Sequence, residues 1–298
     1  SGWLIDVINR GSELVILAIG MTLVTAASGG QDISVGAVMA VAAAVCCQIL
    51  SGGEVSTNTL AAPIIIAAIA GILVAALCGA FNGFLVAKLN IQPMVATLIL
   101  FTAGRGIAQL VTQGQITYVR VESYKAMGGF LGPIPTPVIF AVAAVIVAYL
   151  VLNKTALGMY IESVGINSHA SRLIGLNSTR IKFLTYVICG ALAGLAGIVA
   201  SSRIYSADAN NIGLNLEMDA ILAVALGGGK FSLMGSVIGA YTIQALTTTL
   251  YAMSVPSDQL PVYKAIVVII IVVLQSPVYK KAMQNYKAKR QSKKAVVQ

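Results

Sequence analysis

Long apolar runs determine what this chain can fold into. They are continuous over about twenty residues, whereas the strands of a membrane barrel would give stretches of about ten residues with alternating polarity. Hydrophobic residues make up 58% of the 298 residues and charged residues only 10%. The sequence therefore predicts an all-α protein, a polytopic bundle of membrane helices. About nine membrane segments are expected: 11–28, 33–50, 61–87, 94–113, 136–153, 183–203, 216–229, 234–253 and 262–277.

Lysine and arginine residues give the orientation of the bundle. The tail at 280–298 carries seven basic residues and no acid, which places it in the cytoplasm under the positive-inside rule. Counting membrane crossings backward from this tail places 154–182 in the cytoplasm as well. Thirteen of the nineteen basic residues, those of the tail included, then lie on the cytoplasmic side. The N-terminus then falls outside, which favours a further helix before residue 1. The connections expected outside are 51–60, 114–135, 204–215 and 254–261.

The net charge of +9 would suggest a nucleic acid partner in a soluble protein. Here the basic residues follow the membrane orientation instead, so no nucleic acid partner is expected. We expect one transmembrane domain over 1–279, with a cytoplasmic loop at 154–182, and a basic cytoplasmic tail over 280–298. Because His169 is the only histidine, neither a metal site nor a histidine-based catalytic triad is expected.

Two stretches of the chain are similar to each other. Residues 23–40 (LVTAASGGQDISVGAVMA) align without gaps with 222–239 (LAVALGGGKFSLMGSVIG), and six of the eighteen positions are identical. Glycine-interrupted apolar segments at corresponding places in two halves are typical of transporters with internal repeats. Because 216–229 is short for a span, a partial or re-entrant helix is expected there. The alternative is close helix packing through small residues, without duplication.

A short polar segment interrupts the apolar runs at 162–182. Asn167 or Ser168 can cap a helix whose apolar side is formed by Ala170, Leu173 and Ile174, and Gly175 is positioned to end this helix. Two turns are too few to be stable alone in water, so the helix must be held by its own membrane domain or by another protein.

The opposite face, with Ser168, His169, Ser171 and Arg172, is then available to a soluble partner. The alternative is a simple connecting loop, held at the membrane surface by basic residues. A loop that only connects two spans needs few residues, however, and this one has nearly thirty.

The residues of this segment carry a family resemblance. The pattern G-x-N-x-x-A-x-x-x-x-G-L-N at 165–177 resembles the coupling loop of permease subunits from bacterial ABC sugar importers, in the branch that transports ribose, xylose and galactose. Stretches such as FNGFLVAKLNIQPMVATLILFTAGRGIAQL at 81–110 and ADANNIGLNLEMDAILAVALGGG at 207–229 extend the likeness over nearly the whole chain. The chain looks most like galactofuranose-type permeases. It departs from the family pattern at Gln31, Lys230 and Phe231.

The resemblance implies a transport subunit and not an enzyme. ATP with its magnesium ion would be bound and hydrolysed by a separate cytoplasmic ABC ATPase, so this chain would need no cofactor. An extracytoplasmic sugar-binding protein would deliver the substrate, and a second permease subunit, identical or related, would complete the path in the bacterial inner membrane. The residues implied to couple the chain to the ATPase are Glu162, Gly165, Asn167, His169, Ala170, Arg172, Leu173 and Gly175.

Polar residues within the apolar runs are candidates for the substrate path, because unpaired polar groups are costly in hydrocarbon. Asp32 is flanked by glycines, and its alternative role is to cap the helix that follows. Arg105 and Gln109 share one helix face. Arg105 is expected to pair with a carboxylate or with backbone carbonyls in preference to contacting sugar. The candidates are Asp32, Ser34, Asn82, Thr97, Arg105, Gln109, Asn210 and Asn211.

Three other functions were weighed against this one. A secondary transporter driven by an ion gradient would use Asp32 as its cation site but gives no reason for the helix at 167–174. An intramembrane enzyme would need a catalytic pair within the bilayer, and none is visible in the sequence. An ABC permease for branched-chain amino acids has a related architecture, and the motifs above favour sugar over it.

Overall fold

The computed structural model describes residues 2–229 and 231–275, and these form an all-α bundle as the apolar runs predict. A helix occupies each of the nine predicted segments or most of it. Three further helices lie between them: α5 (Glu122–Lys125), α7 (Ala156–Ile166) and α8 (Ser168–Leu173). The nine are α1 (Gly2–Ser28), α2 (Val35–Ser51), α3 (Ile64–Ala87), α4 (Pro93–Val111), α6 (Thr136–Lys154), α9 (Ser178–Ile204), α10 (Leu216–Leu226), α11 (Leu233–Ala252) and α12 (Leu260–Gln275).

Five of the described helices, α1, α3, α4, α6 and α9, are long and apolar enough to cross a membrane. Their burial separates an inner group from an outer group. Most of α1 and α9 is buried, whereas most residues of α3, α4 and α6 are half-buried or exposed. A helix that is apolar all round and exposed on one side is suited to contact lipid. The bundle is therefore built around α1 and α9, with the other three helices facing outward.

Small residues bring α3 and α9 into close contact. A Cβ atom at Gly79 of α3 would collide with the carbonyl oxygen of Tyr186 in α9, and a Cβ atom at Gly190 of α9 would collide with that of Ala75 in α3. In membranes, helix association depends on such close backbone packing, because lipid already satisfies the apolar surface. The glycines are thus required for this pair of helices to pack as they do.

Short strands tie three loops together at one end of the bundle. β1 (Ser56–Thr57) pairs in parallel with β2 (Thr117–Val119), and β2 pairs antiparallel with β5 (Ser206–Ala207). A separate hairpin joins β3 (Phe130–Leu131) to β4 (Ile134–Pro135). Strands of two or three residues carry no periodic signal, so the sequence could not predict them.

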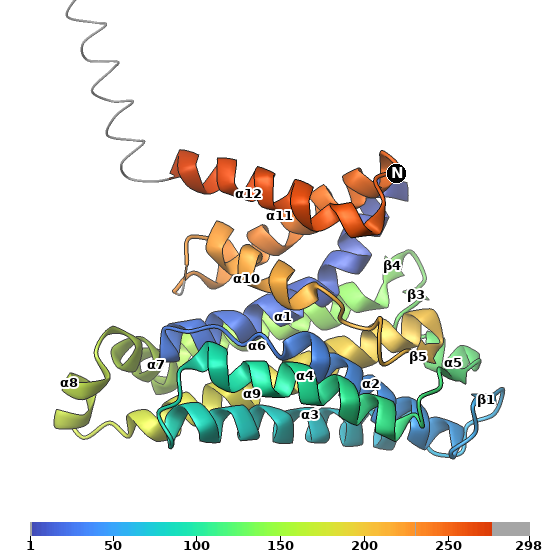
Figure 1. The fold of residues 1–298 in the computed structure, drawn as a ribbon, viewed down its shortest axis with the longest axis horizontal. Helices are drawn as coiled ribbons and strands as arrows, with labels where there is room; N and C mark the ends of the chain where they lie inside the picture. The colour runs from blue at the N-terminus through green and yellow to red at the C-terminus, as the bar shows by residue number, and fades with distance from the viewer. Residues whose placement is uncertain (1, 230, 276–298) are drawn as a thin grey trace, which may run out of the picture. The chain divides into compact units, whose positions relative to one another are not determined.

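The sheet also shows which loops lie at the same end of the bundle. Its strands come from 51–60, 114–135 and 204–215, which the charge count placed on one side of the membrane. Figure 1 shows α7 and α8 at the opposite end of the bundle from β1 and β5. These three loops therefore lie at one end and 154–182 at the other, as predicted, and which end is cytoplasmic stays a prediction.

A buried tyrosine anchors the sheet end in the bundle. Tyr124 of α5 is fully buried, and its hydroxyl lies 2.6 Å from Ser201 Oγ of α9 and 3.5 Å from Cys47 Sγ of α2. One side chain of a surface helix thus reaches two membrane helices.

The chain divides into two compact units after Ala245. In the second unit a single 3-10 turn, Ser257–Gln259, leads into α12. Lys230, the domain boundary predicted at 279 and the basic tail predicted at 280–298 all lie outside the described residues.

Candidate functional site

The helix predicted at 167–174 is present as α8. The side-chain oxygen of Asn167 accepts hydrogen bonds from the backbone N–H groups of His169 and Ala170, both at 3.0 Å. Gly175 follows the helix with φ at +88°, a left-handed conformation that favours glycine at a helix end. The predicted cap and stop signals are therefore confirmed.

The prediction of which face of α8 is free was wrong in part. Leu173 is 89% exposed and Ile174 is 75% exposed, while Ser171, expected on the free face, is buried. Ser171 Oγ donates to the carbonyl of the N-cap residue Asn167 at 2.8 Å, within the same helix, and Arg172 Nε donates to Ser178 Oγ at the start of α9 at 2.6 Å. Leu173 and Ile174, on the apolar side of α8, thus face outward. The side chains of His169 and Ala170 are also exposed.

The helix α7 before it was not predicted. It begins after Thr155, whose hydroxyl accepts from the Leu157 N–H at 3.3 Å. Its buried residues Ile161 and Val164 pack against Leu23, Ala26 and Ala27 at the end of α1, and against Ile181. The spacing of Leu157, Ile161 and Val164 has helical periodicity and would have indicated the helix.

Gly165 allows α7 to approach the end of α1. A Cβ atom at Gly165 would collide with the carbonyl oxygen of Ala26 and would lie 3.6 Å from the ring of Phe231. Glu162, one turn earlier, lines a cavity of about 340 Å³ that also includes Thr22, Asn153 and Ser232. The predicted coupling segment therefore touches both glycine-interrupted stretches of the chain.

The two interruptions are present where the repeat places them. The first lies between α1 and α2, with Gly29 at φ +69°, and the second lies between α10 and α11, with Gly228 at φ +95°. A buried hydrogen bond of 2.8 Å from Thr22 Oγ1 to Ser236 Oγ joins the helices beside them.

The first group of predicted path residues forms a buried cluster at the first interruption. Asp32 is 2% exposed, and its Oδ1 accepts from the backbone N–H of Ser34 at 2.9 Å and from the Ser34 hydroxyl at 2.6 Å. Asn82 donates to Ser34 Oγ at 2.8 Å, and Thr97 Oγ1 accepts from the Ile33 N–H at 3.1 Å. The N-cap residue of α2 is Ser34 and not Asp32, so Asp32 stabilises the turn before α2 and does not cap the helix itself. Its part in a substrate path stays a prediction.

The second group forms a separate cluster at the sheet end. Arg105 donates to the backbone carbonyls of Ala209 and Ile212, as expected of this residue. Gln109, on the same face of α4, donates to Asn210 Oδ1 at 2.6 Å. Asn211 donates instead to Asp208 Oδ2 at 2.6 Å. The eight candidates therefore belong to two clusters and not to one site.

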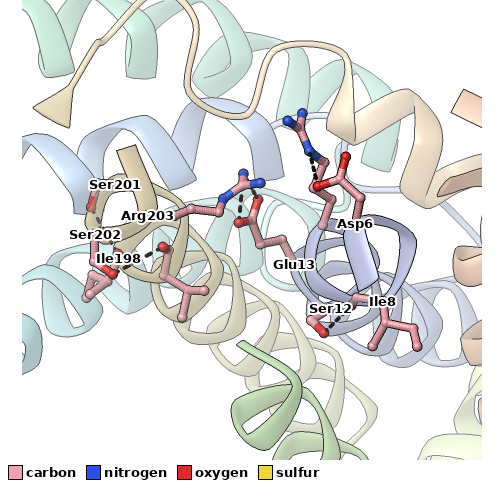
Figure 2. Close-up of polar contacts among 10 residues, drawn as sticks. Asp6, Ile8, Ser12, Glu13, Ile198, Ser201, Ser202 and Arg203 are labelled. Carbon is pink, nitrogen blue, oxygen red and sulfur yellow. Dashed lines mark hydrogen bonds and ion pairs between the residues drawn. The ribbon is translucent and has the colours of Figure 1, made fainter. Parts of the chain in front are cut away.

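An ion pair between α1 and α9 was not predicted. Figure 2 shows Glu13 and Arg203 pointing toward each other, with Arg203 Nη2 2.9 Å from a carboxylate oxygen of Glu13. The Glu13 side chain is only 5% exposed. Two opposite charges in apolar runs were the available signal, because such charges usually pair within a membrane bundle.

Comparisons with known proteins agree with the geometry. Residues 3–275 match the family described as branched-chain amino acid transport system / permease component. The galactofuranose transporter permease YtfT of Escherichia coli is 47% identical over 91% of this chain and 79% of its own. The fructose import permease FruF of Bifidobacterium longum is 40% identical over 97% and 82%. The ribose import permease RbsC of Escherichia coli is 34% identical over 92% and 85%.

The fold also matches a solved structure, PsaBC from Streptococcus pneumoniae in complex with Fab. The TM-score is 0.53 with 11% identity, over 96% of each chain, which supports the fold alone. The relatives named above are transport subunits and not enzymes. With a family match over nearly its whole length and relatives at 34 to 47% identity, this chain belongs to the permease components of membrane transport systems.

Proposed function

We propose that this chain is the membrane-spanning subunit of an ATP-driven ABC importer for a simple sugar, in the bacterial inner membrane with its C-terminus in the cytoplasm. The observation that carries the proposal is the 47% identity to a galactofuranose permease over 91% of the chain. The family description names branched-chain amino acids, but relatives that cover most of the chain are named for galactofuranose, fructose and ribose. Sugar is therefore the favoured substrate class.

The exposed apolar side of α8 supports a cytoplasmic ATPase as partner. Leu173 and Ile174 are exposed on a two-turn helix whose Arg172 binds Ser178 at the start of α9. Burying two such side chains against a partner contributes about 3 to 6 kcal/mol. ATP and its magnesium ion are proposed to bind to that partner.

The route from α8 into the membrane runs through α7. Because α7 packs on the last turn of α1 through Ile161 and Gly165, a displacement of α8 reaches the first glycine interruption directly. A rigid connection of this kind can bias two conformations of the membrane helices. The sheet end then receives the extracytoplasmic sugar-binding protein, and a second permease subunit completes the path.

Co-expression with the ATPase and the binding protein tests the proposal. Leu173→Asp places a charge on the apolar side of α8, so we expect loss of ATPase co-purification and loss of sugar uptake. Val55→Asp, an equally simple change at an exposed apolar residue of the sheet end, should leave the ATPase bound. Uptake of leucine instead of any monosaccharide would contradict the assignment to sugar, and normal co-purification of Leu173→Asp would contradict the role of α8.

A further inference from the structure

A cavity of about 310 Å³ lies at the sheet end of the bundle, on the side opposite α8. Its walls come from α1, α9, the strands β2 and β5, and the loop that follows β5. This volume is at the lower end of the range for small-molecule sites, about 300 to 1,000 Å³. The lining residues that matter for its chemistry are Glu13, Tyr118, Arg203, Asp208, Asn211 and Leu214.

The charged part of the lining is the ion pair of Glu13 and Arg203. Nη2 of Arg203 binds the Glu13 carboxylate, while its Nε is buried and has no hydrogen-bond partner among the described residues. A buried donor without a partner costs about 1 to 3 kcal/mol. The pair therefore offers both a carboxylate acceptor and a guanidinium with unused donor capacity beside the cavity.

A further part of the lining, in the loop after β5, is held by hydrogen bonds before any ligand arrives. Asp208 Oδ1 accepts from the N–H groups of Asn210 and Asn211 at 2.9 and 3.3 Å, which closes the turn after β5. Arg105 of α4 donates to two carbonyls of the same loop. Side chains placed in advance lose little entropy on binding, which favours affinity for a small ligand.

We propose that this cavity binds one monosaccharide as an uncharged, hydroxyl-rich ligand at the outer end of the transport path. The proposal rests on the proposed function and goes beyond it by assigning a site within a single subunit. Neighbouring sugar hydroxyls both donate and accept, so they match a carboxylate and a guanidinium side by side. The ring face needs an apolar or aromatic surface, and Tyr118 supplies it.

The charges of the cavity select against an ionised ligand. The cavity lining contains two carboxylates, Glu13 and Asp208, and one guanidinium, Arg203, so it carries one excess negative charge. A sugar acid would add a third carboxylate to this lining, where like charges repel each other. Neutral sugars are therefore expected to bind and sugar acids to be rejected.

Cysteine protection tests the site in the full chain, assembled with its ATPase in lipid nanodiscs. Leu214→Cys places a thiol on the exposed rim of the cavity, and the alkylation rate with a water-soluble maleimide is measured with D-galactose, D-fructose, D-ribose or D-gluconate. At least one neutral sugar should slow alkylation threefold or more, and D-gluconate should not. Val55→Cys, exposed at the same end but outside the cavity, should react at the same rate with and without sugar.

Two second-site variants then identify the contacts. In the Leu214→Cys background, Glu13→Gln should raise the sugar concentration for half-protection at least fivefold. Asn211→Ala should raise it about threefold, and because Asn211 is exposed its removal does not endanger folding. Asn58→Ala, an exposed amide of the 51–60 loop, is the matched control and should change nothing.

The uptake assay separates the two levels of the proposal. If the assembled transporter takes up a monosaccharide but that sugar protects none of the cavity variants, the cavity assignment is overturned and the proposed function stands. If protection occurs and is unchanged in both Glu13→Gln and Asn211→Ala, these residues do not form the site and the assignment also fails. If no monosaccharide is transported at all, it is the proposed function that fails.

Discussion

The two ends of the bundle are built in opposite ways. At the sheet end, polar groups bind one another: Arg105 holds backbone carbonyls, and Tyr124 reaches across to Ser201. At the other end, α8 leaves Leu173 and Ile174 exposed, and α7 meets α1 through a glycine contact. The polar groups named at the sheet end have partners within the chain, whereas the exposed apolar side chains of α8 would be buried only by a partner protein. The difference indicates a rigid receiving end and a docking end within one subunit.

The largest effect is expected from Gly165→Val at the docking end. Because even a Cβ atom collides with the Ala26 carbonyl, α7 must move away from α1, and overpacking of this kind costs about 1 to 3 kcal/mol or more. We expect sugar uptake to fall at least tenfold while ATPase co-purification persists. Gly106→Ala, a helical glycine with no heavy atom within 4 Å of an added Cβ, should transport normally. Full uptake by Gly165→Val would show that the contact is not needed.

A smaller effect is expected from Arg105→Gln at the sheet end. The change removes charge-assisted hydrogen bonds to the carbonyls of Ala209 and Ile212, each worth about 1.5 to 3 kcal/mol before solvent exposure reduces it. Hydrogen exchange at residues 208–214 should become faster by about tenfold, and exchange in α7 and α8 should stay the same. Faster exchange at both ends would contradict the independence of the two ends.

Loss of the α8 cap should weaken docking moderately. Asn167→Ala removes the acceptor for the His169 and Ala170 N–H groups, which costs about 1 kcal/mol of helix stability. The affinity for the ATPase, measured by titration in nanodiscs, should therefore fall about fivefold. Asn167→Asp keeps the acceptor and should bind normally, so equal weakening in both variants would rule out the cap as the cause.

The smallest effect is expected from Tyr124→Phe. It removes the hydroxyl that lies 2.6 Å from Ser201 Oγ and leaves the ring packed, at a net cost of about 0.5 to 1.5 kcal/mol. The thermal unfolding midpoint should fall by a few degrees, with uptake unchanged. A fall in uptake without a fall in the unfolding midpoint would mean that this hydroxyl acts in transport and not in stability.

Features with a local sequence signal were predicted well. The length of the apolar runs predicted nine of the helices, and the count of basic residues predicted which of the described loops lie at the same end. Asn167 and Gly175 predicted the limits of α8. The glycine repeat gave both interruptions. Each of these depends on residues close together in sequence or on a count along the chain, so no tertiary contact had to be known.

Features that depend on distant partners were not predicted. The sheet joins strands of two or three residues from three loops, and Glu13 pairs with a residue 190 positions away. The free face of α8 was misjudged because Ser171 is buried, whereas Leu173 and Ile174 are exposed. Apolar periodicity shows that a helix has two faces, but the contacts of its ends decide which face is free.

The position of α9 has one more consequence. This helix begins at Ser178, which Arg172 of α8 contacts, and its last turn contains Arg203 of the cavity, about 40 Å away at 1.5 Å per residue. An unbroken helix changes length very little, so the two contacts are parts of one body. By thermodynamic linkage, if closure of the ATPase lowers the affinity of the cavity for sugar, bound sugar must disfavour closure by the same free energy. A sugar bound in the outer cavity would then change the conformational equilibrium of the ATPase as well as wait for transport.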